Sequence, residues 1–273
     1  MADKTLGSTG ARLLSILAQD NRTVFSVAEA QRALDSSYDA TKKVLRRLTR
    51  AGWLVRLTAG NYAIVPLSSG DEAVPEANRY VIARDLMGDD TPYTISHESA
   101  MDVHNMLTRP VTRVIVTTPQ RLANREILGV PYRFVYARPS ALWGSEPVWV
   151  TPYEQVTVAD PERTILDGLA RPDLCAGVGQ VATGLWMRQD DFDWDRVAQH
   201  AHKLGRGAVA QRLGYLLELL ELGTPSLIDS LQEMVTTSYA QLDSLLPDDG
   251  PYLARWRLRV NLEPETLRAV ART

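Results

Sequence analysis

Residues 37–65 read SYDATKKVLRRLTRAGWLVRLTAGNYAIV, and their periodicity changes once, near Gly52. Before this glycine, apolar side chains recur at helical spacing and predict one packed stripe, made of Ala40, Val44, Leu45 and Leu48. After it, two short apolar runs flank a turn at residues 58–61. The stretch therefore predicts a helix followed by a β-hairpin wing.

The predicted helix is basic on the side away from its apolar stripe. At about 100° per residue, that side holds Lys42, Lys43, Arg46 and Arg50. Residues 36–56 contain six Lys or Arg and a single acid. Lysine and arginine neutralise DNA phosphates, and a helix with a packed back fits the major groove. We therefore expect a DNA recognition helix; a cationic helix that only faces solvent is the alternative.

Two further helices are predicted upstream, which gives the element order of a winged helix-turn-helix. Ser26 and Glu29 have the spacing of a capping box at the start of the second helix. Ser36 or Ser37 is the expected cap of the third helix, and such a helix N-terminus attracts phosphate. Side chains of the wing can reach the DNA backbone or the minor groove. The residues predicted to contact DNA are Ser37, Tyr38, Lys42, Lys43, Arg46, Arg50, Arg56 and Asn61.

Length and charge both predict two domains. A chain of 273 residues is long enough for two hydrophobic cores. We expect a winged helix at residues 1–67, a linker at 68–76 and a second domain at 77–273. Residues 1–70 hold ten basic and five acidic side chains, whereas residues 71–273 hold twenty and twenty-eight. This asymmetry favours nucleic acid as the partner of the N-terminal end.

The second domain mixes strands and helices without the alternation of a βαβ fold, so the predicted fold class is α+β. Strands are predicted near residues 114–118, 132–136, 148–150, 155–158 and 256–260. Helices are predicted at 78–87, 97–107, from Asp160-Pro161 onward, and at 176–188, 193–203, 207–222 and 225–240. We therefore expect a mixed α/β domain with a helical C-terminal half.

Several classes of protein are disfavoured by the sequence. The lone Cys175 excludes an internal disulfide and fits a reducing compartment. No secretory signal and no apolar run of membrane-spanning length is evident, so we expect a cytoplasmic protein without a membrane partner. Walker A, dinucleotide and nucleophile-elbow motifs are missing, and the spacing of the four histidines offers no third metal ligand. We expect neither a metal nor a cofactor.

Two polar clusters are candidate sites in the second domain. The first runs from Ser96 to His104, and the second is residues 160–167, DPERTILD. Helix capping and an ion pair at i,i+4 explain much of both clusters. The alternatives are a surface for a protein partner and phosphoryl chemistry, for which the candidate catalytic residues are Ser96, His97, Asp160 and Glu162. A basic patch on the late helices is predicted from Lys203, Arg206 and Arg212.

Several segments in this order resemble the AbiEi antitoxin family. They are TPYTISHESAMDVH at residues 91–104, VADPERTILD at 158–167, RLGYLLE at 212–218 and WRLRVN at 256–261. The N-terminal segments LTRAGWLVR at 48–56 and GNY at 60–62 are similar to the DNA-binding half of the family. The resemblance thus covers nearly the whole chain.

The resemblance implies the antitoxin of a bacterial toxin–antitoxin system that acts in abortive infection and phage defence. Its N-terminal winged helix is expected to repress its own operon by binding inverted repeats in double-stranded promoter DNA. Its C-terminal domain is expected to neutralise a cognate AbiEii-type nucleotidyltransferase toxin, by complex formation, by antagonism at the toxin's target or by covalent modification.

Two other functions are left open by the sequence. Covalent modification of the toxin would make the C-terminal domain an atypical protein kinase. Alternatively, the chain is a ligand-sensing transcriptional regulator. Because no coiled coil or evident dimer helix is present, we expect monomers in solution that cooperate on DNA.

Overall fold

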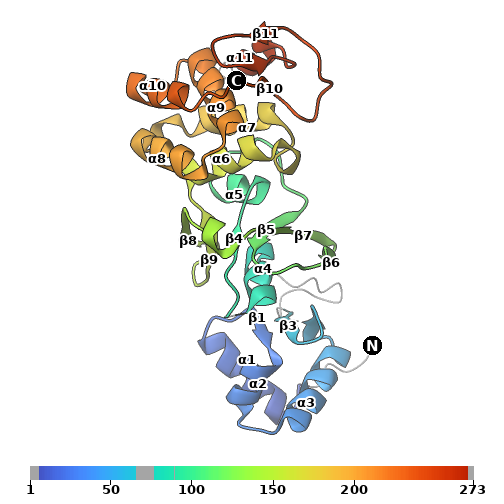
Figure 1. The fold of residues 1–273 in the computed structure, drawn as a ribbon. Helices are drawn as coiled ribbons and strands as arrows, with labels where there is room; N and C mark the ends of the chain where they lie inside the picture. The colour runs from blue at the N-terminus through green and yellow to red at the C-terminus, as the bar shows by residue number, and fades with distance from the viewer. Residues whose placement is uncertain (1–5, 66–76, 89, 270–273) are drawn as a thin grey trace. The chain divides into compact units, whose positions relative to one another are not determined.

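The computed structural model describes residues 6–65, 77–88 and 90–269 of the chain (Figure 1). The chain divides into two compact units. Unit 1 comprises residues 1–93, 124–132 and 147–156, and unit 2 comprises residues 94–123, 133–146 and 157–273. The expected linker at 68–76 lies outside the described residues. The division differs from the expected one, because residues 77–93 and two later segments group with the N-terminal residues.

Unit 1 begins with three helices and three short strands. They are α1 (Ser8–Gln19), β1 (Val24–Ser26), α2 (Val27–Leu34), α3 (Tyr38–Arg50), β2 (Leu54–Arg56) and β3 (Asn61–Ile64). The strands form an antiparallel sheet in the order β1-β3-β2. The predicted capping box is confirmed, because the Ser26 side chain accepts from the Glu29 amide and the Glu29 carboxylate accepts from the Ser26 amide. The start of α2 could be predicted from the sequence, because a capping box involves residues only three positions apart.

The packed side of α3 differs by one residue from the predicted stripe. Leu45 and Leu48 are buried as expected, but Thr41 is buried where Ala40 was expected, and Ala40 is exposed. Thr41, Leu45 and Leu48 follow the i, i+4, i+7 spacing of one helix face. The Thr41 hydroxyl shares a 2.7 Å hydrogen bond with the Ser36 hydroxyl, which satisfies this polar group inside the core.

Hydrogen bonds explain why later residues belong to unit 1. The side chain of Asn78 caps α4 (Arg79–Met87), and its amide nitrogen donates to the Val150 carbonyl at 3.0 Å. The buried carboxylate of Glu154 accepts from Arg84 at 3.1 Å and from the Thr23 hydroxyl at 3.0 Å. These contacts join residues 70 or more positions apart, which local sequence patterns do not report.

A six-stranded mixed sheet has the order β6-β7-β5-β4-β9-β8. Its strands are β4 (Thr94–Ile95), β5 (Val114–Thr118), β6 (Arg125–Ile127), β7 (Val130–Tyr136), β8 (Ser145–Trp149) and β9 (Gln155–Ala159). β4 pairs antiparallel with β5 and parallel with β9, where Ile95 lies opposite Val158. The four strands predicted between residues 114 and 158 are all present, and the mixed α/β character of the chain is confirmed.

The later part of unit 2 is mainly helical. Its helices are α5 (Glu98–Val103), α6 (Pro161–Ala170), α7 (Val178–Met187), α8 (Trp194–Leu204), α9 (Gly207–Leu220), α10 (Pro225–Glu233) and α11 (Pro264–Ala269). Short 3-10 helices occur at η2 (Pro139–Ala141), η3 (Pro172–Leu174) and η4 (Gln189–Asp191). Figure 1 shows α6 to α10 gathered into one helical layer, and their buried apolar side chains form a common core. Among the described residues, no helix combines the length and apolarity needed to cross a bilayer.

Two predicted helices are shorter than expected. The helix expected at 97–107 spans only Glu98–Val103, because His97 and Asn105 have positive φ values of 53° and 56° that an α-helix does not contain. The helix expected at 225–240 ends at Glu233. The chain then enters a small sheet of β10 (Ala240–Gln241), β11 (Tyr252–Leu253) and β12 (Leu258–Arg259), in the order β10-β12-β11.

A close contact between Gly214 and Trp256 ties α9 to the C-terminal sheet. Trp256 is fully buried, and its indole nitrogen donates to the Glu218 carboxylate at 2.7 Å. A Cβ at Gly214 would lie 2.1 Å from two ring atoms of Trp256, so only glycine fits here. The two sequence segments that contain these residues, 212–218 and 256–261, are therefore neighbours in the fold.

Candidate nucleic-acid interface and buried polar network

The exposed side of α3 is a candidate nucleic-acid interface. Ser37 caps the helix, with its hydroxyl accepting from the Ala40 amide at 3.4 Å. Behind the helix, Thr41, Leu45 and Leu48 are buried. The α3 cationic face consists of Lys42, Lys43, Arg46 and Arg50.

Side chains of the α3 cationic face keep their charges available. Lys43, Arg46 and Arg50 are exposed, and Lys42 is half-buried. Within the described ranges, no ion pair involves any of the four. The Lys42 ammonium lies 4.9 Å from the ring centre of Tyr38, which is 52% exposed. A row of unpaired cations on a packed helix suits a polyanion, because no internal pair has to break when the polyanion binds.

Arg56 and Asn61, the two hairpin residues predicted to contact DNA, differ in their hydrogen-bond partners. The exposed Arg56 donates to the carbonyls of Thr58 and Ala59 at 2.9 and 3.2 Å, so its guanidinium closes the turn and retains further donors. Asn61 was also predicted to contact DNA, but its amide nitrogen donates to the Asp85 carbonyl at 3.0 Å. This hydrogen bond directs the Asn61 side chain to α4, which sequence patterns could not predict from 24 residues away.

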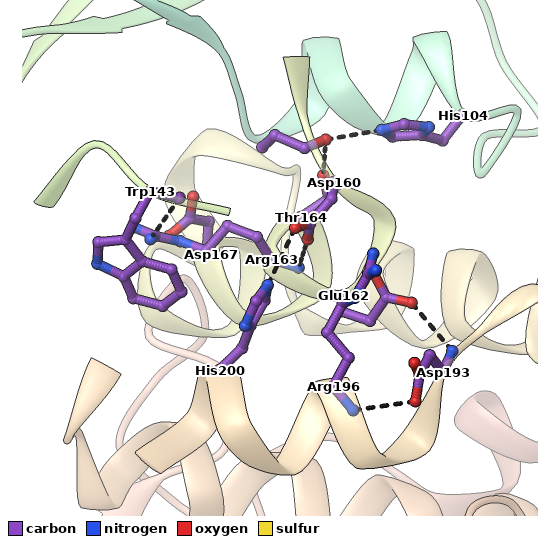
Figure 2. A network of polar contacts seen from close by, with 11 residues as sticks. His104, Trp143, Asp160, Glu162, Arg163, Thr164, Asp167, Asp193, Arg196 and His200 are labelled. Carbon is purple, nitrogen blue, oxygen red and sulfur yellow. Dashed lines mark hydrogen bonds and ion pairs between the residues drawn. The ribbon is translucent and has the colours of Figure 1, made fainter. Parts of the chain in front are cut away.

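In unit 2, a second group of polar side chains surrounds the start of α6 (Figure 2). Asp160 caps this helix as predicted, accepting from the Arg163 amide at 2.7 Å. Its other oxygen lies 3.0 Å from Nε2 of His200 on α8. The carbonyl of Ala159 accepts from the Thr164 hydroxyl at 3.1 Å and lies 2.7 Å from Nε2 of His104. The network therefore joins the end of β9 to three other elements.

Glu162 points to different partners from Asp160. One of its oxygens accepts from the Asp193 amide at 3.0 Å, and the other lies 3.7 Å from the Arg196 guanidinium (Figure 2). Both carboxylates are buried, with 3% of Glu162 and 6% of Asp160 exposed. The two acids thus stabilise separate contacts with α8 and do not converge on one point. Within the described part of the chain, no group of three His, Cys, Asp or Glu side chains could hold a metal ion.

Trp143 completes this network, a role that no local sequence pattern predicts for it. The predicted ion pair between Arg163 and Asp167 is confirmed at 2.8 Å. The same guanidinium lies 4.0 Å from the Trp143 ring centre, and the Lys203 ammonium lies 4.5 Å from it. The His200 ring packs edge-on against the indole at 5.1 Å. Cation–π contacts of this kind join residues that are far apart in sequence, so only the fold reveals them.

Ser96 and His97 are buried beside the sheet. The Ser96 hydroxyl shares hydrogen bonds of 2.7 Å with the Thr117 hydroxyl and 2.9 Å with Nδ1 of His97. It does not cap α5, whose N-cap position is occupied by His97 without a side-chain hydrogen bond. Burial lowers the pKa of His97 to about 4, so the imidazole is neutral at pH 7.

Access to the candidate catalytic residues is narrow. Ser96 lines a cavity of about 10 Å³ together with Thr117, Trp143 and Arg163. That volume admits about one water molecule and is far smaller than a nucleotide. Asp160 and Glu162 are each engaged in internal hydrogen bonds. In this structure the four candidate residues therefore hold elements together and do not line an open catalytic cleft.

The basic patch predicted from Lys203, Arg206 and Arg212 is not present as such. Arg212 is buried, and its guanidinium donates to the carbonyls of Leu169 and Gln241 at 2.6 to 3.0 Å. Lys203 and Arg206 are exposed. Arg212 thus binds backbone carbonyls of the core, which helical periodicity alone could not distinguish from a surface position.

Comparisons with known proteins bear on the fold. No protein-family profile matches the chain, and a search among curated proteins gives no match. Among solved structures, the crystal structure of the RV2827C protein from Mycobacterium tuberculosis is similar, with a TM-score of 0.71 and 20% sequence identity. The match covers 100% of this chain and 97% of that one. The two proteins therefore share an overall fold along their whole length.

Proposed function

We propose that this chain is a DNA-binding antitoxin that represses its own operon through unit 1 and neutralises a nucleotidyltransferase-type toxin through unit 2. The α3 cationic face is the observation that carries the proposal. Its charges are unpaired within the described residues, and its opposite side is buried against the core of unit 1. This combination is what phosphate binding and major-groove insertion need.

The element order supports a winged helix-turn-helix as the DNA-binding module. Helices α1, α2 and α3 precede the hairpin of β2 and β3, and β1 pairs with β3 to complete a three-stranded sheet. In this interpretation α3 enters the major groove and the hairpin is the wing. Ser37, Tyr38, Lys42, Lys43, Arg46, Arg50 and Arg56 are the proposed contact residues, and we propose two monomers that cooperate on an inverted repeat.

The antitoxin role rests on the resemblance of this sequence to the AbiEi family. Two of the resembling segments, 212–218 and 256–261, pack on each other through Gly214 and Trp256. A third, 158–167, forms the start of α6 and its polar network. The segments that carry the resemblance thus support the framework of unit 2, as expected if they define a shared fold and not an active site.

DNA binding can be tested with the full chain and a labelled duplex of the promoter upstream of its own gene. We expect Lys42→Ala and Arg46→Ala each to weaken binding. Each should lower the slope of log K against log salt by about one if the side chain contacts a phosphate, whereas a base contact should cost about 1–3 kcal/mol at one base pair. The matched control is Arg206→Ala, which removes an exposed arginine from unit 2. Equal affinity of all four proteins would refute the assignment of α3.

The antitoxin role needs a separate growth experiment. The full chain with Arg46→Glu and Arg50→Glu would be co-expressed with a nucleotidyltransferase encoded by the neighbouring gene. We expect growth to be rescued while promoter repression is lost, because the two tasks belong to different units. Growth arrest with both the wild-type chain and the variant, at normal expression levels, would contradict the antitoxin role. Rescue by the wild type alone would make protection depend on the α3 cationic face.

A further inference from the structure

A broad groove in unit 1 is not used by the proposed function. Its volume is about 600 Å³, within the range of about 300–1,000 Å³ that small-molecule sites occupy. Most of its lining is apolar and comes from α1, the hairpin and the segment before β9. The principal lining side chains are Leu14, Ala18, Trp53, Ile64, Val65 and Tyr153. No residue of α3 lines it, so the groove is separate from the α3 cationic face.

Trp53 lines this groove, but its indole nitrogen is not exposed in it. Its indole nitrogen is buried and has no acceptor among the described residues. Buried N–H groups in folded proteins nearly always have an acceptor, because the desolvated donor costs free energy otherwise. Trp53 thus adds to the groove lining, but its buried nitrogen is not open to a molecule bound there.

One charge marks the polar end of the groove. Of the described lining residues, only Arg22 is charged. Its guanidinium is 3.5 Å from the Glu29 carboxylate, and its side chain is 40% exposed, so this ion pair is loose and partly solvated. Asn21 and Thr23 flank it in the lining. An anion at this position would meet a guanidinium with donors to spare.

We propose that this groove binds an amphipathic organic anion. Its apolar body, large enough for two fused or linked rings, packs against Leu14, Ala18 and Tyr153. Its carboxylate or sulfonate pairs with the Arg22 guanidinium. The inference goes beyond the proposed function and does not depend on it, since it concerns a different surface of unit 1.

The site can be tested with the fluorescent probe 8-anilinonaphthalene-1-sulfonate and the full chain. We expect saturable binding at one site. Ala18→Trp and Ser15→Trp fill the groove from exposed positions on α1, and each should weaken binding at least tenfold. The matched control is Gln19→Trp, at an exposed neighbouring position outside the lining, which should bind as the wild type does. Absence of binding to the wild type, or equal binding to all four proteins, would overturn the proposal.

A second pair of measurements tests the class of ligand. Arg22→Gln should weaken binding of the sulfonate probe several-fold and leave binding of its uncharged analogue N-phenyl-1-naphthylamine unchanged. If both probes lose affinity equally, or neither does, the anionic part of the proposal is wrong. Circular dichroism of each variant checks that the fold is kept, and Ser15→Trp serves as the filling variant if Ala18→Trp does not fold.

Discussion

The α3 cationic face and the network around Asp160 use the same kinds of residue in opposite ways. On α3, Lys43, Arg46 and Arg50 extend into solvent without a carboxylate partner in the described chain. Around Asp160, the carboxylates of Asp160, Glu162 and Asp167 are buried or half-buried, and each has an internal partner. The first arrangement keeps charge available for binding, and the second uses charge to join elements. Burial, more than residue type, separates the two roles.

This comparison predicts that substitutions of buried polar side chains in unit 2 cost stability, whereas those on the α3 cationic face cost DNA affinity alone. The largest expected change in stability concerns His97. Burial lowers the pKa of this side chain to about 4. The unfolded chain takes up a proton near pH 6.5, which the folded chain resists until about pH 4. This contribution to stability is therefore present above pH 6.5 and is lost as the pH falls toward 4, by about 3 kcal/mol.

The measurement for His97 is denaturant unfolding between pH 4 and pH 7.5. His97→Asn, whose side chain takes up no proton in this pH range, should show a flatter pH dependence than the wild type. A parallel pH dependence in the two proteins would mean that His97 is not the group responsible.

The next effect concerns Glu98 at the start of α5. This carboxylate is 3% exposed and binds the guanidiniums of Arg109 and of Arg113, the latter at 3.0 Å. Glu98→Ala should lower the free energy of unfolding by about 2–3 kcal/mol, less than a fully buried pair costs because both arginines are partly solvated. Glu126→Ala, at an exposed position on β6, is the control and should change it by less than about 0.5 kcal/mol. Similar losses in both variants would contradict a special role for Glu98.

Asp160 should show an intermediate effect. Asp160→Ala removes the cap of α6 and the partner of His200, for an expected loss of about 1–2 kcal/mol. Asp160→Asn keeps an oxygen for the Arg163 amide and should lose less than Asp160→Ala. Thermal or denaturant unfolding of both variants ranks them. If both were as stable as the wild type, the network would not be structural, and a functional role for Asp160 would gain weight.

Asp85 in unit 1 should show the opposite effect, because replacing its carboxylate is expected to raise the free energy of unfolding at pH 7. Burial raises its pKa to about 6 although Arg84 lies 2.9 Å away, and one of its oxygens has no hydrogen-bond donor among the described residues. Its contribution to stability is present below pH 3.8 and is lost as the pH rises through 6. Asp85→Asn should therefore raise the unfolding free energy at pH 7 by about 1 kcal/mol and have no such effect near pH 4. A destabilised variant at pH 7 would show that the Arg84 pair outweighs burial.

The smallest expected effect is on the α3 cationic face. Lys43→Ala and Arg46→Ala remove exposed side chains that form no ion pair with any residue the structure describes, so the unfolding free energy should change by less than about 0.5 kcal/mol. The same variants should weaken DNA binding. A large loss of stability in either variant would remove the contrast with the Asp160 network.

Local patterns in the sequence predicted much of the secondary structure. The capping box at Ser26, the cap at Asp160 and the ion pair of Arg163 with Asp167 each involve residues three or four positions apart. Such interactions are set by helix geometry and need no knowledge of the rest of the chain. The basic character of residues 36–56 also follows from the sequence alone, because it depends only on which residue types are present.

The tertiary structure decided which of these residues are free to act. Thr41 is buried where Ala40 was expected, and the Asn61 side chain donates to the Asp85 carbonyl. Arg212 is buried and donates to backbone carbonyls. The hydrogen bond between Asp160 and His200 spans 40 positions, and that between Glu162 and Asp193 spans 31. Periodicity identifies a helix face but not the element that covers it, and burial by a distant element sets whether a polar side chain binds a partner or stabilises the fold.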